Sequence, residues 1–287
     1  MAALRAHVAE LTQVTDQSLE PIQENAYRLA TQPAYFVKLI ADEDRLGQNE
    51  LRVHQDILKK AQIPRPELVY QMKIPGATIA CWDWLEGTDL RYQSRDWLVQ
   101  AFEHLGRFHA QQRHEGPLES PVTQRRYDTV EDLLEVDLAT LVRQHPETVR
   151  KAALKARGLL GMGYATFIHG DMHPGNLRLA REGLKFVDWG YCIPSLNLFD
   201  LGYIETVELV EPGEGIPWWT IRPEEACLVL PAYFAACGMG GVDYDQVQLA
   251  VMFWSKLWAY ENCVKFGNSA DAVKVANQLM KMASLLS

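Results

Sequence analysis

Three side chains that could bind a metal ion and move a proton, Asp171, Asn176 and Asp188, lie in the stretch FIHGDMHPGNLRLAREGLKFVDWG. Carboxylate and amide oxygens are the ligands that a hard cation such as Mg²⁺ prefers. A further carboxylate nearby can take a proton from an attacking hydroxyl. The residue types therefore suggest a metal-assisted group transfer, and the alternative is ordinary loop and turn polarity.

The apolar runs between these residues predict a β-hairpin. The segments LRLA and LKFVD have the length of short strands, and the REG between them fits a three-residue turn ending in glycine. Centring this turn on Glu182 pairs Arg178 with Phe186 and Asn176 with Asp188. Directly opposed residues have Cα atoms about 4.5–5.5 Å apart and side chains on one face. The predicted register therefore brings Asn176 and Asp188 together as a Mg²⁺ site.

Asp171 lies in the loop that follows the apolar segment YATFI, shortly before Asn176. A carboxylate at this place is close to the predicted metal pair without being needed as a ligand. Metal oxygens, a base that orients the nucleophile and cationic groups on the phosphates are the parts that phosphoryl transfer requires.

The motif HGDMHPGN followed by DWG resembles the catalytic loop and metal-binding motif of the aminoglycoside phosphotransferase and choline kinase-like family. The resemblance implies that Asp171 is the catalytic base and that Asn176 and Asp188 bind Mg²⁺. It also implies ATP, or another nucleoside triphosphate, as the phosphoryl donor. His169 and His173 match the family's histidines at these positions, and we expect them to hold the loop in place.

The same resemblance implies an α+β, bilobal protein-kinase-like fold with a small β-rich N-terminal lobe and a larger, mainly helical C-terminal lobe. We place a nucleotide-binding lobe at residues 1–85 and a catalytic and acceptor-binding lobe at residues 86–287. The segment FDLG resembles the family's D-L-A segment and makes Asp200 a buried anchor of the loop.

Hydrophobic patterns agree with these lobes. Apolar runs predict strands at residues 34–40 and 77–85, and helical spacing predicts a helix at residues 48–61. Helical periodicity also predicts a helix at residues 96–112, and the segment at 244–267 is apolar nearly all round, so we expect a buried helix there.

A kinase-like site also needs a lysine on a strand that is oriented by an acid on the following helix. Lys38 in YFVKLI and Glu50 in QNELRVHQDIL occupy those places. Because burying an unpaired lysine is costly, an ion pair is expected; the alternative is a solvent-facing lysine on an edge strand. The segment CWDWLEG resembles the hinge between the lobes, which implies that Trp82 backs the adenine pocket and that the main chain of Asp83 and Leu85 binds the base.

One departure from the family concerns the loop that covers the phosphates. The family's loop usually carries a glycine, whereas LEPIQENAYRLA at residues 19–30 has none. This departure supports the alternative function, a catalytically weak, pseudokinase-like protein that binds a nucleotide or ligand. A protein kinase fits less well, because the short segment between DWG and FDLG leaves little room for an activation segment.

The composition of the chain argues against several kinds of partner. The net charge of −9 argues against nucleic acid, because no excess of Lys and Arg is available to displace counterions. The five cysteines form no CxxC pair, which favours reduced thiols over a disulfide framework or a zinc site. No run approaches the roughly 18 apolar residues of a membrane span, and the N-terminus has no signal-peptide core. We therefore expect a cytoplasmic protein without a membrane partner.

The acidic balance fits a small-molecule acceptor that is polar and cationic. An aminoglycoside-like sugar or an amino alcohol would meet this description, with a hydroxyl as the phosphorylated group. The acid-rich segment at residues 205–215 is a candidate part of the acceptor pocket, and the alternative is a solvated face.

Overall fold

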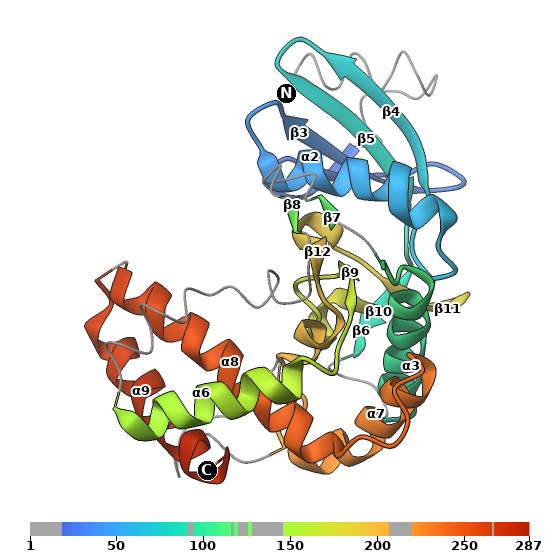
Figure 1. The fold of residues 1–287 in the computed structure, drawn as a ribbon. Helices are drawn as coiled ribbons and strands as arrows, with labels where there is room; N and C mark the ends of the chain where they lie inside the picture. The colour runs from blue at the N-terminus through green and yellow to red at the C-terminus, as the bar shows by residue number, and fades with distance from the viewer. Residues whose placement is uncertain are drawn as a thin grey trace.

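The computed structural model describes residues 19–90, 95–115, 118–119, 126–127, 146–206, 220–265 and 267–286. These residues form two lobes, with the β-sheet of the N-terminal lobe above the helices of the C-terminal lobe in the view of Figure 1. The architecture is the α+β, bilobal arrangement expected from the sequence.

The N-terminal lobe is built on one antiparallel sheet with the strand order β1-β2-β3-β5-β4. Side chains alternate between the two faces of a strand. Val37 of β3 is therefore buried on one face, and Ile40 is buried on the other, where Leu51 of helix α2 covers it. The strands are β1 (Leu19–Gln23), β2 (Ala26–Leu29), β3 (Tyr35–Ala41), β4 (Leu68–Ile74) and β5 (Ala77–Asp83).

Helix α2 (Arg45–Arg52) connects the sheet to the C-terminal lobe. It begins after Asp44, whose carboxylate accepts a hydrogen bond from the Gly47 amide at 3.0 Å, and it continues through a π-helical turn, η2 (Val53–Ile57), and a 3-10 turn, η3 (Leu58–Lys60). The helix predicted at residues 48–61 is confirmed, with an earlier start at its N-cap.

The C-terminal lobe is mainly helical. Its helices are α3 (Arg95–Gln111), α6 (Glu147–Leu160), α7 (Pro223–Ala236), α8 (Tyr244–Lys265) and α9 (Ser269–Leu286). Short strands lie between the helices and the N-terminal lobe: β6 (Gly87–Asp89) pairs with β10 (Leu177–Ala180), β10 with β11 (Gly183–Phe186), β9 (Ala165–Ile168) with β12 (Ile193–Leu196), and β7 (Leu118–Glu119) with β8 (Arg126–Tyr127). The chain thus crosses from β5 to β6 through residues 84–86. The predicted division into residues 1–85 and 86–287 falls in this crossing and stays a prediction.

The prediction that the last long apolar helix is buried is correct for its first half only. Val247, Ala250 and Phe253 of α8 are fully buried. Trp258 is 61% exposed, and Val264 is also exposed. The uniform apolar character of the sequence thus did not reveal that the helix leaves the core.

The predicted register of the β10–β11 hairpin is wrong by one residue. Arg178 pairs with Lys185 rather than with Phe186, and the Val187 amide donates to the Asn176 carbonyl at 3.0 Å. The reason is the turn, which holds two residues rather than three, so that Gly183 belongs to the strand and takes a φ of 106°. Asn176 is therefore not the cross-strand partner of Asp188.

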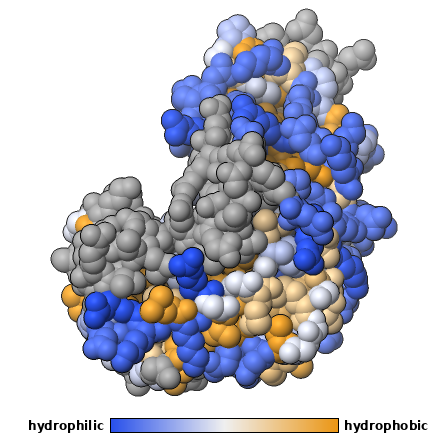
Figure 2. Space-filling model, in the orientation of Figure 1, coloured by the Kyte–Doolittle hydropathy of each residue, from blue (hydrophilic) through white to orange (hydrophobic). Residues whose placement is uncertain are grey.

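No helix in the described part of the chain is long and apolar enough to cross a membrane. Hydrophilic residues predominate on the face of the N-terminal lobe shown in Figure 2.

Candidate active site

A cavity of about 350 Å³ lies between the two lobes. Its volume is within the range of roughly 300–1,000 Å³ typical of small-molecule sites. Residues of β1, β3, α2 and β5 line it from the N-terminal lobe, and residues around β10 and β11 line it from the C-terminal lobe. They include Ile22, Gln23, Phe36, Lys38, Glu50, Trp82, Asp83, Leu85, Asn176, Arg178 and Asp188.

The predicted ion pair between strand and helix is present. The Lys38 Nζ lies 3.0 Å from Glu50 Oε2, and the side chains are 25% and 10% exposed. The Trp189 backbone N–H also donates to the Glu50 carboxylate. Burial alone would lower the pKa of Lys38, but attraction to Glu50 and then to Asp188 outweighs it and raises that pKa. Lys38 is thus held as a cation that faces the cavity.

Asn176 and Asp188 both line the cavity, although they are not cross-strand partners. Asp188 follows the strand in a left-handed conformation, with φ 62° and ψ 64°, so the strict alternation of side chains ends there. The Asn176 Nδ2 donates to the main-chain carbonyl of Asp171 at 2.8 Å and to its carboxylate Oδ2 at 3.1 Å. This leaves the amide oxygen Oδ1 of Asn176 as the atom available to a cation.

The Asp171 carboxylate is held by several donors. Tyr203 donates its hydroxyl hydrogen to Oδ1 at 2.7 Å, and Oδ2 lies near the Asn176 amide and 3.5 Å from the His173 Nε2. Partial burial raises the pKa of Asp171, but the hydrogen bonds from His173, Tyr203 and Asn176 lower it to about 2. The carboxylate is therefore ionised at neutral pH, and its orientation is fixed.

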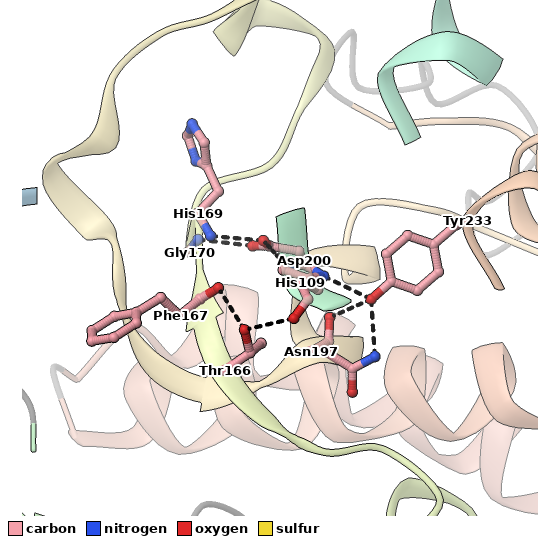
Figure 3. Close-up of polar contacts among 8 residues, drawn as sticks. All are labelled: His109, Thr166, Phe167, His169, Gly170, Asn197, Asp200 and Tyr233. Carbon is pink, nitrogen blue, oxygen red and sulfur yellow. Dashed lines mark hydrogen bonds and ion pairs between the residues drawn. The ribbon is translucent and has the colours of Figure 1, made fainter. Parts of the chain in front are cut away.

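The loop that carries Asp171 is anchored by Asp200, as expected (Figure 3). The amides of His169 and Gly170 donate to the Asp200 carboxylate at 2.7 and 2.8 Å, and His109 Nε2 lies 3.0 Å from it. On its other side, His109 Nδ1 is 2.8 Å from the hydroxyl of Tyr233. Each of these side chains is buried, so Asp200 serves as an internal support of the loop.

His169 and His173 both contact backbone groups near the loop, which agrees with the loop-fixing role expected of them. His173 Nδ1 accepts a hydrogen bond from the Gly175 amide at 3.0 Å, and His169 Nε2 lies 2.9 Å from the Val187 carbonyl. Burial lowers the pKa of His169 and keeps the ring neutral, so Nε2 is the atom that donates. The contact of His173 with Asp171 was not expected.

The segment predicted to be the hinge lines the cavity. Trp82 is buried and lines the cavity beside Asp83 and Leu85. The Asp83 amide already donates to the Glu67 carbonyl at 3.1 Å, which leaves the Asp83 carbonyl as its main-chain group for a base. Base binding by Asp83 and Leu85 stays a prediction.

The hairpin between β1 and β2 shows how the chain turns without glycine. Asn25 takes the left-handed conformation, with φ 60°, and its carbonyl accepts a hydrogen bond from the Leu39 amide at 2.8 Å. Asparagine tolerates this conformation better than most residues because its short polar side chain can hydrogen-bond locally. Ile22 and Gln23, before the turn, line the cavity.

The sequence did not reveal several residues of the site. Among them, Tyr203 contacts Asp171, and Arg178 lines the cavity. Arg178 lies two residues past Asn176, a signal that was available, whereas nothing local marks Tyr203. Of the acid-rich segment, only Glu205 and Thr206 are among the described residues; burial raises the pKa of Glu205.

The chain belongs to the phosphotransferase enzyme family, whose model matches residues 19–249. This match supports a phosphotransferase, in agreement with the class expected from the motifs. A search of curated proteins finds no match.

Several solved structures share the fold. APH(2″)-IIa, in a ternary complex with streptomycin and ATP, has a TM-score of 0.62 at 14% identity, covering 99% of this chain and 98% of its own. Choline kinase from Cryptosporidium parvum Iowa II has a TM-score of 0.55 at 10% identity, covering 99% and 93%. Aminoglycoside phosphotransferase APH(3″)-Id from Streptomyces rimosus, in complex with ADP and streptomycin, has a TM-score of 0.50 at 14% identity, covering 88% and 98%. At these identities the likeness concerns the fold.

Proposed function

We propose that this protein transfers the γ-phosphoryl group of ATP to a hydroxyl of a small polar molecule. The observation that carries the proposal is that Lys38, Asn176 and Asp188 line one cavity while Asp171 is hydrogen bonded to Asn176. A cation for the phosphates, oxygen ligands for a metal and a carboxylate for the nucleophile are the parts that phosphoryl transfer needs.

In this reaction, the oxygen of the acceptor hydroxyl forms a bond to the γ-phosphorus, and the bond from that phosphorus to the β–γ bridging oxygen breaks. ADP leaves, and the hydroxyl proton passes to the carboxylate of Asp171. With its pKa at about 2, Asp171 is a weak base. Its main contribution is therefore to orient the hydroxyl, and it accepts the proton once the bond to phosphorus has formed.

The residues present fit a magnesium ion. Asn176 Oδ1 is left free by the hydrogen bonds of its amide nitrogen to Asp171, and Asp188 adds a carboxylate. These two groups would hold Mg²⁺, which neutralises phosphate charge when bound. Within the described residues there is no cluster of three or more His, Cys, Asp or Glu side chains with metal-site geometry, so a bound Mg²⁺ would complete its shell with phosphate and water oxygens.

A cationic acceptor is supported by the net charge of −9. The fold neighbours include structures with streptomycin and a choline kinase, which suggests these two compounds as first acceptors to test. Streptomycin represents the aminoglycoside-like sugars in this test, and choline represents the amino alcohols.

The test is a screen of hydroxyl acceptors with Mg-ATP, following ADP release and identifying the phosphorylated product by mass spectrometry. Asp171→Asn should lower kcat at least 100-fold with little change in the KM for ATP, since loss of a general base costs about 10²–10⁴-fold. Near wild-type turnover in this variant would remove Asp171 from the proposed role. Nucleotide binding without transfer to any acceptor would favour a pseudokinase-like binding protein instead.

A further inference from the structure

Tyr203 is a group of the site that comes from the segment leading toward the acid-rich stretch. It lies just past the 3-10 turn η7 (Asn197–Leu201), and its side chain is about half-buried. Its hydroxyl donates to Asp171 Oδ1 at 2.7 Å, the shortest of the hydrogen bonds described at that carboxylate. The Tyr203 ring packs edge-on against the His173 ring, with 5.5 Å between the ring centroids and 74° between the planes. This contact restricts the movement of the Tyr203 ring.

The two oxygens of Asp171 are divided among donors from different elements. Tyr203 holds Oδ1, whereas Asn176 and His173 lie at Oδ2. Because His173 Nδ1 accepts from the Gly175 amide, a neutral His173 carries its hydrogen on Nε2, the atom that faces Asp171. Without Tyr203, the Asp171 carboxylate would be held only through Oδ2 and could rotate about that contact.

Tyr203 is itself held in place from the core. The fully buried Gln248 of α8 donates from Nε2 to the carbonyls of Leu201 and Ile204, at 2.8 and 2.7 Å. The Ile221 amide donates to the Tyr203 carbonyl at 2.9 Å. The backbone on both sides of Tyr203 is thus tied to α8 and to the segment before α7, so the phenol is fixed before any substrate binds.

We propose that Tyr203 is a positioning residue, which holds Asp171 Oδ1 in the orientation that receives the acceptor hydroxyl. This inference rests on the proposed phosphotransferase function. An oxygen of an ionised carboxylate accepts more than one hydrogen bond, so Oδ1 can take the phenol and a substrate hydroxyl together. A base must lie within about 2.6–3.2 Å of the proton it accepts, and supporting hydrogen bonds are what keep a side chain within that range.

Two substitutions separate the hydroxyl from the ring. Tyr203→Phe keeps the packing on His173 and removes the hydrogen bond, whereas Tyr203→Leu removes both. With Mg-ATP and streptomycin or choline as the acceptor, we expect both variants to lose at least about tenfold in kcat while the KM for ATP stays within about twofold. Tyr244→Phe removes a phenol hydroxyl from a ring that packs on Phe234, away from Asp171, and should leave kcat unchanged. Wild-type kcat in Tyr203→Phe would show that only the ring matters and would overturn the proposal.

The double variant Asp171→Asn with Tyr203→Phe adds a second criterion. If Tyr203 acts through Asp171, its loss should have no further effect on kcat in the Asp171→Asn background. Independent effects that multiply would contradict a role through Asp171.

A readout that needs no turnover separates this inference from the proposed function. The Tyr203 hydroxyl and the Asp171 carboxylate share a hydrogen bond, so the losses of stability in Tyr203→Phe and Asp171→Asn should not add in the double variant when urea unfolding is measured at pH 7. Additive losses would overturn the hydrogen-bonding role. Coupled losses in a protein that transfers phosphoryl groups to no acceptor would retain the contact and reject the phosphotransferase.

Discussion

Asp171 combines partial exposure with hydrogen bonds at both carboxylate oxygens. The sequence predicted that it lies near Asn176, because a short loop separates the two residues. The donors that set its basicity could not be inferred in the same way. Tyr203 comes from a distant turn, and its approach depends on how α8 holds that turn.

The depressed pKa of Asp171 predicts a specific loss of stability in acid. The folded-state pKa of about 2 lies below the ordinary aspartate pKa of 3.8, so the contribution is present above pH 4 and is lost as pH falls toward 2. Between pH 6 and pH 3 the loss is about 1 kcal/mol. Urea unfolding at the two pH values should show this loss in the wild type and not in Asp171→Asn; equal losses in both proteins would contradict the assignment.

The Lys38–Glu50 pair predicts non-additive substitutions. Lys38→Met leaves Glu50, only 10% exposed, without its cation and should destabilise the protein by about 2–4 kcal/mol. Adding Glu50→Gln removes the unpaired charge and should recover part of that loss, while nucleotide binding stays weak in both variants. Denaturant unfolding of the two single variants and the double variant measures the coupling, and simple additivity would contradict it.

Among the elements, the strands and helices that position the site were largely predictable from hydrophobic periodicity. Strand β3, helix α2 and helix α3 lie where that periodicity placed them. The hairpin register was not predictable, because two-residue and three-residue turns both suit the segment REG, and they differ by one residue in pairing. Asn176 and Asp188 share the cavity for a different reason, namely the left-handed backbone at Asp188.

The loop that carries Asp171 predicts a sharp contrast with another glycine of the chain. Gly170 has a φ of 82°, and a Cβ there would lie 2.2 Å from the Tyr191 carbonyl oxygen. Gly170→Ala should therefore destabilise the protein by about 2 kcal/mol or more, since strain and overpacking add. Gly158→Ala, in α6 with no atom within 4 Å of its Cβ, is the matched control and should be neutral or stabilising by about 0.5–1 kcal/mol. Similar unfolding midpoints for the two variants would refute the strain argument.

For the whole molecule, helix α2 provides one of the physical links between the lobes. The buried Asn49 donates from Nδ2 to the carbonyls of Gly190 and Cys192, at 2.9 and 2.8 Å. Those carbonyls follow Asp188, so the helix that carries Glu50 is tied directly to the loop that carries the predicted metal ligand. The bilobal fold followed from motif resemblance, but this link joins residues far apart in sequence and has no local signature.

Cutting this link should weaken the response of the whole protein to nucleotide. A ligand at 100 times its Kd stabilises the folded state by about 2.7 kcal/mol, which appears as a rise in Tm. With Mg-ATP at one fixed concentration, Asn49→Ala should show a smaller rise in Tm than the wild type. Gln48→Ala, whose side chain bonds only the Ala41 carbonyl within the same lobe, should keep the full rise. Equal rises in all three proteins would show that the link does not affect nucleotide binding.

The left-handed conformation of Asn25 also determines how easily a mutation could change the β1–β2 hairpin of this protein. A glycine adopts the same backbone angle without strain, so Asn25→Gly would give the β1–β2 hairpin the residue that its family usually carries there. The backbone of the hairpin would not have to change, because Asn25 already has the left-handed angle that the glycine would adopt. Glycine would widen the set of conformations that the turn can adopt. A single substitution, Asn25→Gly, would therefore make this hairpin more flexible.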